Sequence, residues 1–166
     1  MVKSITKRLA EGTVLGAEGY VFELERRGYI KAGPFVPEVV LDFPDAVREL
    51  HREFLRAGAE VMVALTYYAH REKLRDVGRE GDLEAMNRSA VRIARDVAHE
   101  GDALVAGNVC NTWAYDPDDP ATRQVVRAMY AEQLGGGGGR RLRHLRDQRL
   151  PRRGADRAGG QHRARA

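Results

Sequence analysis

Short apolar runs alternate with amphipathic helical patterns over the first 134 residues, and this alternation limits the folds that the chain can adopt. Three runs have the character of buried strands: Val14–Leu15, Val61–Leu65 and Ala103–Gly107. Continuously apolar strands are typical of parallel sheets that are covered on both faces. The order therefore predicts an α/β fold with about three strand–helix units. Periodicity alone leaves open whether the sheet is doubly wound or part of a (β/α)8 barrel.

Helical spacing predicts two long helices between these strands and several shorter ones. The first long helix follows Pro44, ends before Gly58 and has an apolar face of Val47, Leu50, Phe54 and Leu55. The second follows Asp82, ends at Gly101 and has an apolar stripe of Leu83, Met86, Ala90, Ile93, Ala94 and Val97. Shorter helical patterns are expected over residues 21–26, from Pro37, and after the turn at 116–120.

The charge of the chain is divided between two unlike segments. Residues 1–134 hold 18 Lys and Arg and 22 Asp and Glu, a net charge of −4, whereas residues 135–166 hold ten Arg and two Asp, a net charge of +8. The second segment lacks Val, Ile, Phe, Tyr and Trp, so it cannot bury enough apolar surface to offset its ordering entropy. We expect one domain over 1–134 and a disordered Gly/Arg-rich tail over 135–166.

The tail has two interpretations. Gly135–Gly139 can be a flexible linker to an arginine-rich arm that contacts nucleic-acid phosphates. Alternatively, the tail is frameshifted: read one base further on, residues 140–144 can become Val-Asp-Phe-Val-Ile, and residues 151–159 can become Leu-Gly-Glu-Ala-Leu-Ile-Ala-Leu-Glu. These would form a strand and a helix. The tail has no aromatic residues for base stacking, so we favour the frameshift and do not expect nucleic-acid binding.

Cysteine content and hydropathy restrict the location of the protein. Cys110 is the single cysteine of the sequence, which excludes an intrachain disulfide and an all-cysteine metal site within one chain. No run approaches the roughly 20 apolar residues of a membrane span. Residues 1–8 lack the apolar core of a signal peptide. We therefore expect a cytoplasmic protein that does not interact with a membrane.

A glycine-flanked turn, Gly16-Ala17-Glu18-Gly19, joins the first predicted strand to its helix and permits a close backbone approach to a ligand. In the stretch from this turn to Tyr29, the chain resembles the homocysteine S-methyltransferase family, in particular its betaine–homocysteine branch. The resemblance continues in Gly33-Pro34-Phe35-Val36-Pro37-Glu38, Leu50-His51-Arg52-Glu53-Phe54-Leu55-Arg56-Ala57-Gly58 and Thr66-Tyr67-Tyr68-Ala69. It covers roughly residues 8–134.

The resemblance implies that the chain is the N-terminal portion of a (β/α)8 barrel. The implied activity, in methionine biosynthesis, is methyl transfer from an onium donor such as betaine to the homocysteine thiol. The family activates this thiol with zinc held by cysteines of later strands. Those strands are absent here and Cys110 matches no ligand position, so we expect no metal ligand, no zinc and a truncated, inactive fragment. Its open sheet edges would favour self-association.

The resemblance assigns two positions of this chain, Glu18 and Gly19, to homocysteine binding. Glu18 and Gly19 occupy the loop whose backbone faces the amino-acid part of homocysteine in the family. The family has Asp-Gly-Gly there, and this chain has Ala17 in place of the aspartate. Glu18 can pair with the substrate ammonium in its stead, or it can be a surface glutamate in a turn.

The resemblance assigns two positions of this chain, Tyr68 and Phe35, to the methyl-donor part of the site. Tyr68, the candidate catalytic residue, matches a family tyrosine after the second strand, where its hydroxyl can hydrogen-bond donor or substrate and its ring can face a methylated cation. Phe35 stands where the betaine enzymes have a tryptophan and offers a weaker π-face. A further candidate is Asn108, which is chosen for its position after the third strand and either lines the pocket or caps a loop.

Overall fold

A small parallel sheet lies at the centre of the fold. The computed structural model describes residues 3–31, 33, 37–112 and 114–136. The sheet has the order β1 (Gly16–Ala17), β2 (Val61–Val63) and β3 (Leu104–Ala106). Ala17 pairs with Met62, and Met62 pairs with Val105. The predicted α/β architecture with a parallel sheet is therefore confirmed.

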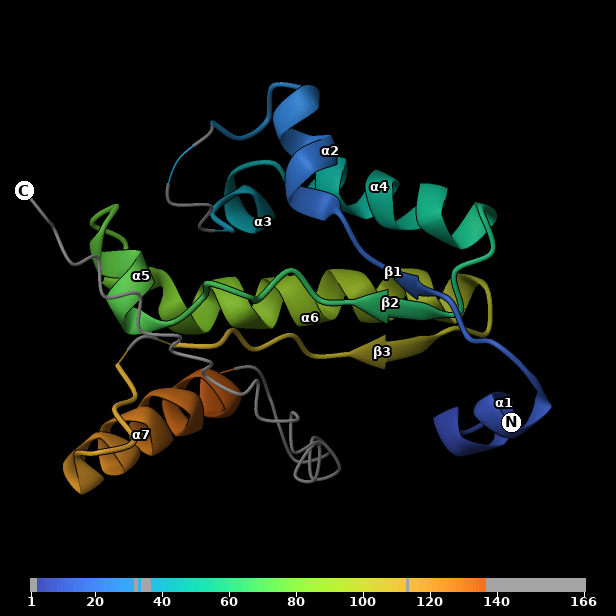
Figure 1. Ribbon diagram of the computed structural model, residues 1–166. Coiled ribbons are helices and arrows are strands. Elements are labelled where there is room, and N and C mark those ends of the chain that lie inside the picture. Colours follow the sequence, from blue (N-terminus) through green and yellow to red (C-terminus); the bar gives the residue numbers. More distant parts are fainter. Residues whose placement is uncertain (1–2, 32, 34–36, 113, 137–166) are drawn as a thin grey trace, which may run out of the picture.

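Helices follow each strand, as the sequence predicts (Figure 1). Those between β1 and β2 are α2 (Tyr20–Arg26), α3 (Val39–Asp42) and α4 (Pro44–Arg56). Those between β2 and β3 are α5 (Arg71–Arg75), the 3-10 turn η1 (Glu80–Asp82) and α6 (Leu83–Glu100). The helix after β3 is α7 (Pro120–Gly136). In the described part of the chain, no helix is both long and apolar enough to cross a membrane.

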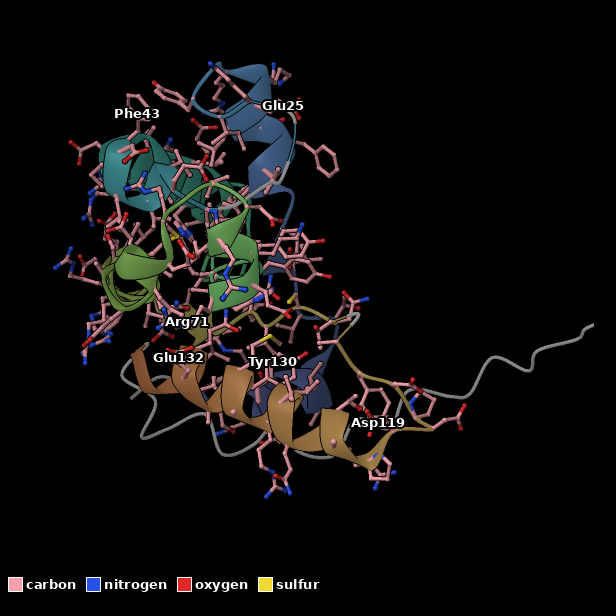
Figure 2. The ribbon with its side chains drawn as sticks, turned by 90° about the vertical axis from the view of Figure 1, so that its left-hand side faces the viewer. Glu25, Phe43, Arg71, Asp119, Tyr130 and Glu132 are labelled. Atoms are coloured by element: carbon pink, nitrogen blue, oxygen red, sulfur yellow. The ribbon has the colours of Figure 1, made fainter. Side chains whose placement is uncertain are left out.

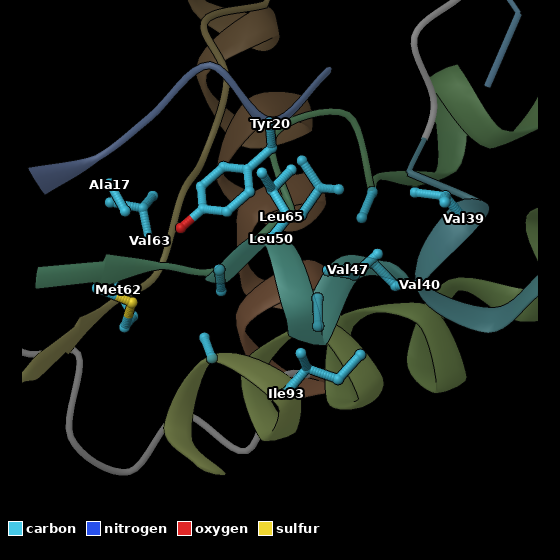
Figure 3. Packing of buried hydrophobic residues seen from close by; sticks show 14 of the residues in the cluster. Ala17, Tyr20, Val39, Val40, Val47, Leu50, Met62, Val63, Leu65 and Ile93 are labelled. Atoms are coloured by element: carbon cyan, nitrogen blue, oxygen red, sulfur yellow. The ribbon is translucent and has the colours of Figure 1, made fainter. Parts of the chain in front are cut away.

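The core forms where α4 and α6 pack against each other and against the sheet. Figure 3 shows side chains from the strands, α2, α3, α4 and α6 meeting in this cluster. All six predicted stripe residues of α6 are buried, as are Val47 and Leu50 of α4, whereas Phe54 and Leu55 are only partly buried. Burying one large apolar side chain contributes about 1.5–3 kcal/mol, so the apolar stripe of α6 is a major source of stability.

Two strand predictions require correction. The first strand comprises Gly16 and Ala17 rather than Val14 and Leu15, and Leu15 is 55% exposed. The carbonyl of Leu15 still accepts hydrogen bonds from the backbone of Glu60 and Val61, so it adjoins the ladder without being covered. The third strand is not buried on both faces, because β3 is an edge strand and Val105 is 38% exposed.

A helix that the sequence did not predict, α1 (Ile5–Glu11), precedes the sheet. The Ser4 hydroxyl caps it by accepting from the Lys7 amide. Figure 1 shows α1 near the ends at which β2 and β3 begin, on the side opposite α5 and α7. Arg8 connects α1 to these strand ends by donating to the Glu60 carboxylate at 2.7 Å and to the Asp102 carbonyl.

Some predictions fall on residues outside those described. Phe35 is one of them, and the predicted disordered, frameshifted tail is another apart from its first two residues. Helix α7 continues to Gly136, two residues into the segment assigned to the tail. The division of the chain at 134 and 135 stays a prediction.

Candidate functional site

Parallel strands place their carboxyl ends at one edge of a sheet, and the predicted site residues follow those ends. Glu18 and Gly19 directly follow β1, Tyr68 lies in the segment after β2, and Asn108 follows β3. Active sites of (β/α)8 enzymes form at this edge. The topology therefore puts all four of these residues in loops at the same edge.

Thr66 joins the loop after β2 to the loop after β3. Its hydroxyl donates to the Asn108 carbonyl at 2.6 Å and accepts from the Asn108 amide at 3.2 Å. The Tyr67 hydroxyl adds a second connection by donating to Asn111 Oδ1 at 2.9 Å. Tyr68 and Asn108 are thus held in linked loops. None of the hydrogen bonds found among the described residues includes the exposed Glu18 side chain.

Tyr68 is half-buried, and its ring lies near two aromatic rings and one lysine ammonium. Its ring lies edge-on to the Tyr67 ring, with centroids 4.7 Å apart, and 6.3 Å from the His70 ring. Lys73 Nζ stands over the Tyr68 ring, 5.1 Å from its centroid. Among the described residues the Tyr68 hydroxyl has no hydrogen-bond partner, so it is available to a ligand.

The turn after β1 is anchored to the core by Tyr20, the first residue of α2. Gly19 has φ 82°, in the left-handed region that glycine tolerates best, and it caps α2. Tyr20 is buried, and its hydroxyl lies 2.9 Å from His51 Nδ1 on α4. Burial raises the pKa of Tyr20 and lowers the pKa of His51 to about 4. Both side chains are therefore neutral near pH 7, and together they connect the Glu18–Gly19 loop to the core.

Cys110 does not have the surroundings of a zinc ligand. Its side chain is buried, and this burial raises the pKa of the thiol, whereas zinc binds the thiolate. Within the described residues, no three His, Cys, Asp or Glu side chains are grouped to hold a metal ion. The sequence supplies no second cysteine. The described residues do not fit the cysteine-held zinc that the sequence resemblance implies.

Helix α7 reaches this edge through polar contacts that sequence reasoning missed. Gln133 is 2% exposed and donates from Nε2 to the Thr66 carbonyl at 2.6 Å. The Tyr130 hydroxyl donates to the Cys110 carbonyl, and Arg71 of α5 pairs with Glu132 (Figure 2). The signal in the sequence was the i, i+3 spacing of Tyr130 and Gln133, which puts two hydrogen-bonding side chains on one helix face.

His70 and Lys73 were also missed. His70 is 1% exposed, and neither of its ring nitrogens has a partner among the described residues. Burial lowers the pKa of His70, which favours the neutral ring. Both residues contact the Tyr68 ring. Neither lies in a quoted family motif, so only the geometry of the loop after β2 identifies them.

The chain is similar to solved and characterised proteins over most of its described length. Its structure matches the metallated form of the homocysteine methyltransferase MmuM from Escherichia coli with a TM-score of 0.64 and 22% identity, over 78% of this chain and 51% of that chain. At this identity the match shows the fold alone. In sequence, the chain is 51% identical over 137 residues to betaine–homocysteine S-methyltransferase 1 of Sus scrofa and to that of Bos taurus.

These matches cover unequal shares of the proteins compared. The alignments include 80% of this chain but 49% of the Sus scrofa protein and 33% of the Bos taurus protein. The chain thus spans about half or less of the length of these relatives. The family model of homocysteine S-methyltransferase matches residues 16–145, which is most of the chain. The chain therefore belongs to the homocysteine S-methyltransferase family.

Proposed function

We propose that this chain forms the first three strand–helix units of a (β/α)8 homocysteine S-methyltransferase. The complete barrel would transfer a methyl group from an onium donor such as betaine to the homocysteine thiol. The observation that carries the proposal concerns the carboxyl ends of the parallel strands. The loops that follow these ends hold Glu18, Tyr68 and Asn108. The names of the relatives support homocysteine as acceptor and betaine as donor.

The roles of the site residues follow from their chemistry. Glu18 is an exposed carboxylate beside the exposed backbone of Gly19, so it can pair with the ammonium of homocysteine. Tyr68 offers a hydroxyl and an aromatic ring to the donor. Asn108 lines a small pocket with Thr66 and Gln133. Phe35 is proposed as a second aromatic contact for the donor.

The reaction requires a reactive sulfur. As the new S–CH3 bond forms, the bond between the methyl carbon and the onium nitrogen breaks, and its electron pair stays on nitrogen. In the complete barrel, zinc held by cysteines outside this chain would supply the thiolate character that makes homocysteine sulfur nucleophilic at neutral pH. This chain has one cysteine, buried with a raised thiol pKa. We therefore propose that the 166-residue chain is a truncated form that binds no zinc and does not turn over.

Self-association through the sheet edges is part of the same proposal. In the described sheet, β1 and β3 each pair on one side only. Val105 of β3 and Val109 beyond it are exposed. Unpaired backbone groups beside exposed apolar side chains favour pairing with another chain. Sedimentation velocity over a range of concentrations should show dimers or larger species, and a monomer throughout would contradict this proposal.

If the tail is frameshifted, as we propose, a one-base change within the codons of Gly135–Gly139 restores the reading frame. The site roles can be tested in the protein made from that gene. In that protein Glu18→Ala should raise the KM for homocysteine, because it removes the partner of the ammonium. Tyr68→Phe should lower kcat, because it removes the hydroxyl but keeps the ring. Glu11→Ala, an exposed change on α1, is the matched control. Unchanged kinetics in both site variants would contradict the assignment.

A further inference from the structure

Lys73 supplies a cation to the Tyr68 ring from within the chain. Its Nζ lies 5.1 Å from the ring centroid, inside the distance of about 6 Å over which cation–π attraction acts. The Lys73 side chain is only 16% exposed, so little water weakens the contact. A quaternary ammonium donor requires the same kind of surface, an aromatic face. The ring is thus in contact with a cation before any donor arrives.

Lys73 and Tyr68 keep this relationship because the segment between them is anchored at several points. The Ala69 amide donates to the Thr66 carbonyl at 3.0 Å, and Asn87 Nδ2 donates to the Ala69 carbonyl at 2.7 Å. Leu74, the next residue after Lys73, is fully buried and holds α5 against the core. The fold of this loop therefore places Lys73 beside Tyr68.

The other groups around Tyr68 limit where a second cation can bind. The Tyr67 and His70 rings both meet the Tyr68 ring at steep angles, 61° and 67°. These neighbours occupy part of the space around the ring. A donor cation that binds the face below Lys73 Nζ would meet a like charge at close range, which is unfavourable. Lys73 must therefore withdraw before a donor can use that face.

Asp76 gives the Lys73 ammonium a second partner, to which it can stay paired when it leaves the ring. Its Oδ2 lies 3.3 Å from Lys73 Nζ, and its side chain is 53% exposed. The ammonium thus has both an exposed carboxylate and an aromatic ring as partners in this structure. Rotation of the flexible lysine side chain toward Asp76 would uncover the ring without breaking the ion pair.

We propose that Lys73 is a resident cation that competes with the onium donor for the Tyr68 ring and thereby sets the affinity of the site for that donor. The inference rests on the proposed role of Tyr68 in donor binding. Lys73 is a specificity-determining residue in this scheme, because a donor must bind the ring strongly enough to displace a lysine ammonium. Asp76 shifts the balance in favour of the donor by stabilising the withdrawn lysine.

The test uses the full 166-residue chain and tetramethylammonium chloride as the probe, since this cation has no carboxylate that could pair with Lys73. Binding is followed by the NMR signals of the tyrosine rings at constant ionic strength, with sodium chloride as the blank. The Tyr68 signals are those that Tyr68→Leu removes. Lys73→Gln should lower the dissociation constant of the probe roughly two- to thirtyfold, the range expected for losing a competing cation–π contact.

Three further variants separate competition from general effects. Lys73→Arg keeps the cation and should bind the probe about as weakly as the original chain. Lys7→Gln, at an exposed position on α1, makes the same change in net charge and should leave the dissociation constant unchanged. Asp76→Asn removes the alternative partner and should raise the dissociation constant. Because Asp76 is exposed, this variant provides a test even if Lys73→Gln does not fold.

The outcomes distinguish this inference from the function on which it rests. If the probe shifts the Tyr68 signals but Lys73→Gln binds it no more tightly than the original chain, competition by Lys73 is disproved and the donor role of Tyr68 stands. If the probe moves the Tyr68 signals in neither protein, the ring binds no onium group, and the proposed donor site fails together with the inference.

Discussion

The Tyr20 hydroxyl lies 2.9 Å from His51 Nδ1, and both side chains are buried. Tyr20 begins α2 directly after the Glu18–Gly19 loop, whereas His51 belongs to α4. The hydrogen bond therefore joins the first loop of the candidate site to the core. Since the His51 Nε2 atom has no partner among the described residues, protonating this ring would place an uncompensated charge in the interior.

The His51 environment predicts loss of stability in mild acid. Its pKa is lowered from 6.5 to about 4 by burial. As the pH falls below 6.5, the unfolded chain binds a proton that the folded chain does not, so the free energy of unfolding decreases until the pH reaches about 4. This group can account for a loss of about 3 kcal/mol. Burial of His70 lowers its pKa too and acts in the same direction.

Urea unfolding at pH 7.5, 6 and 4.5 measures this effect. His51→Gln keeps a hydrogen-bonding side chain without an imidazole, so its unfolding free energy should depend less on pH than that of the original chain. His99→Gln, an exposed change on α6, should retain the original pH dependence. An equal pH dependence in all three proteins would show that His51 is not buried as a neutral ring.

Arg8 should control the docking of α1. The helix has only seven residues and buries none of them, and such a short helix is marginal in isolation. The Arg8 side chain, 11% exposed, pairs with Glu60 and Asp102 where β2 and β3 begin. Arg8→Ala should destabilise the chain by about 1–2 kcal/mol and raise amide exchange throughout residues 5–11. The neighbouring exposed change Lys7→Ala should do neither, and equal exchange in the two variants would exclude this docking role.

Gly101 allows α6 to end beside α4. A Cβ atom at this position would lie 2.8 Å from both terminal methyl carbons of Leu55 and 3.0 Å from its Cγ. Gly101→Ala should therefore cost about 1–2 kcal/mol of unfolding free energy through overpacking. In a Leu55→Ala background the same change should cost less, because the clashing atoms are gone. Gly81→Ala, whose Cβ would meet nothing within 4 Å, is the control, and additive costs at positions 55 and 101 would contradict the argument.

The sequence predicted those parts of the fold whose pattern is long or repeated. The apolar stripe of α6 extends over an 18-residue helix, so helical spacing identified all of its buried apolar residues except Ala98. Helices α1 and α5 are too short for such a period. The exposure of Val105 depends on which elements cover β3, and local hydropathy carries no information about that.

The candidate site could be predicted where residues match family motifs, or where they directly follow a predicted strand, as Asn108 does. Tyr68 was found in this way, but Lys73 and His70 were not, because their importance comes from their positions around the Tyr68 ring. Gln133 is polar and lies in a helix with weak apolar spacing, yet its side chain is buried and donates to the Thr66 carbonyl. Contacts between residues far apart in sequence were therefore the part that pattern analysis missed.

The most direct test of the account measures methyl transfer from methyl-deuterated betaine to homocysteine by mass spectrometry. The purified 166-residue chain is compared with the protein made after the reading frame is shifted by one base within the codons of Gly135–Gly139, as the frameshift interpretation requires. Each protein comes from a host without its own homocysteine methyltransferases. The account predicts deuterated methionine and bound zinc for the restored protein, and neither for the 166-residue chain. Deuterated methionine from the 166-residue chain, or none from the restored protein, would contradict it.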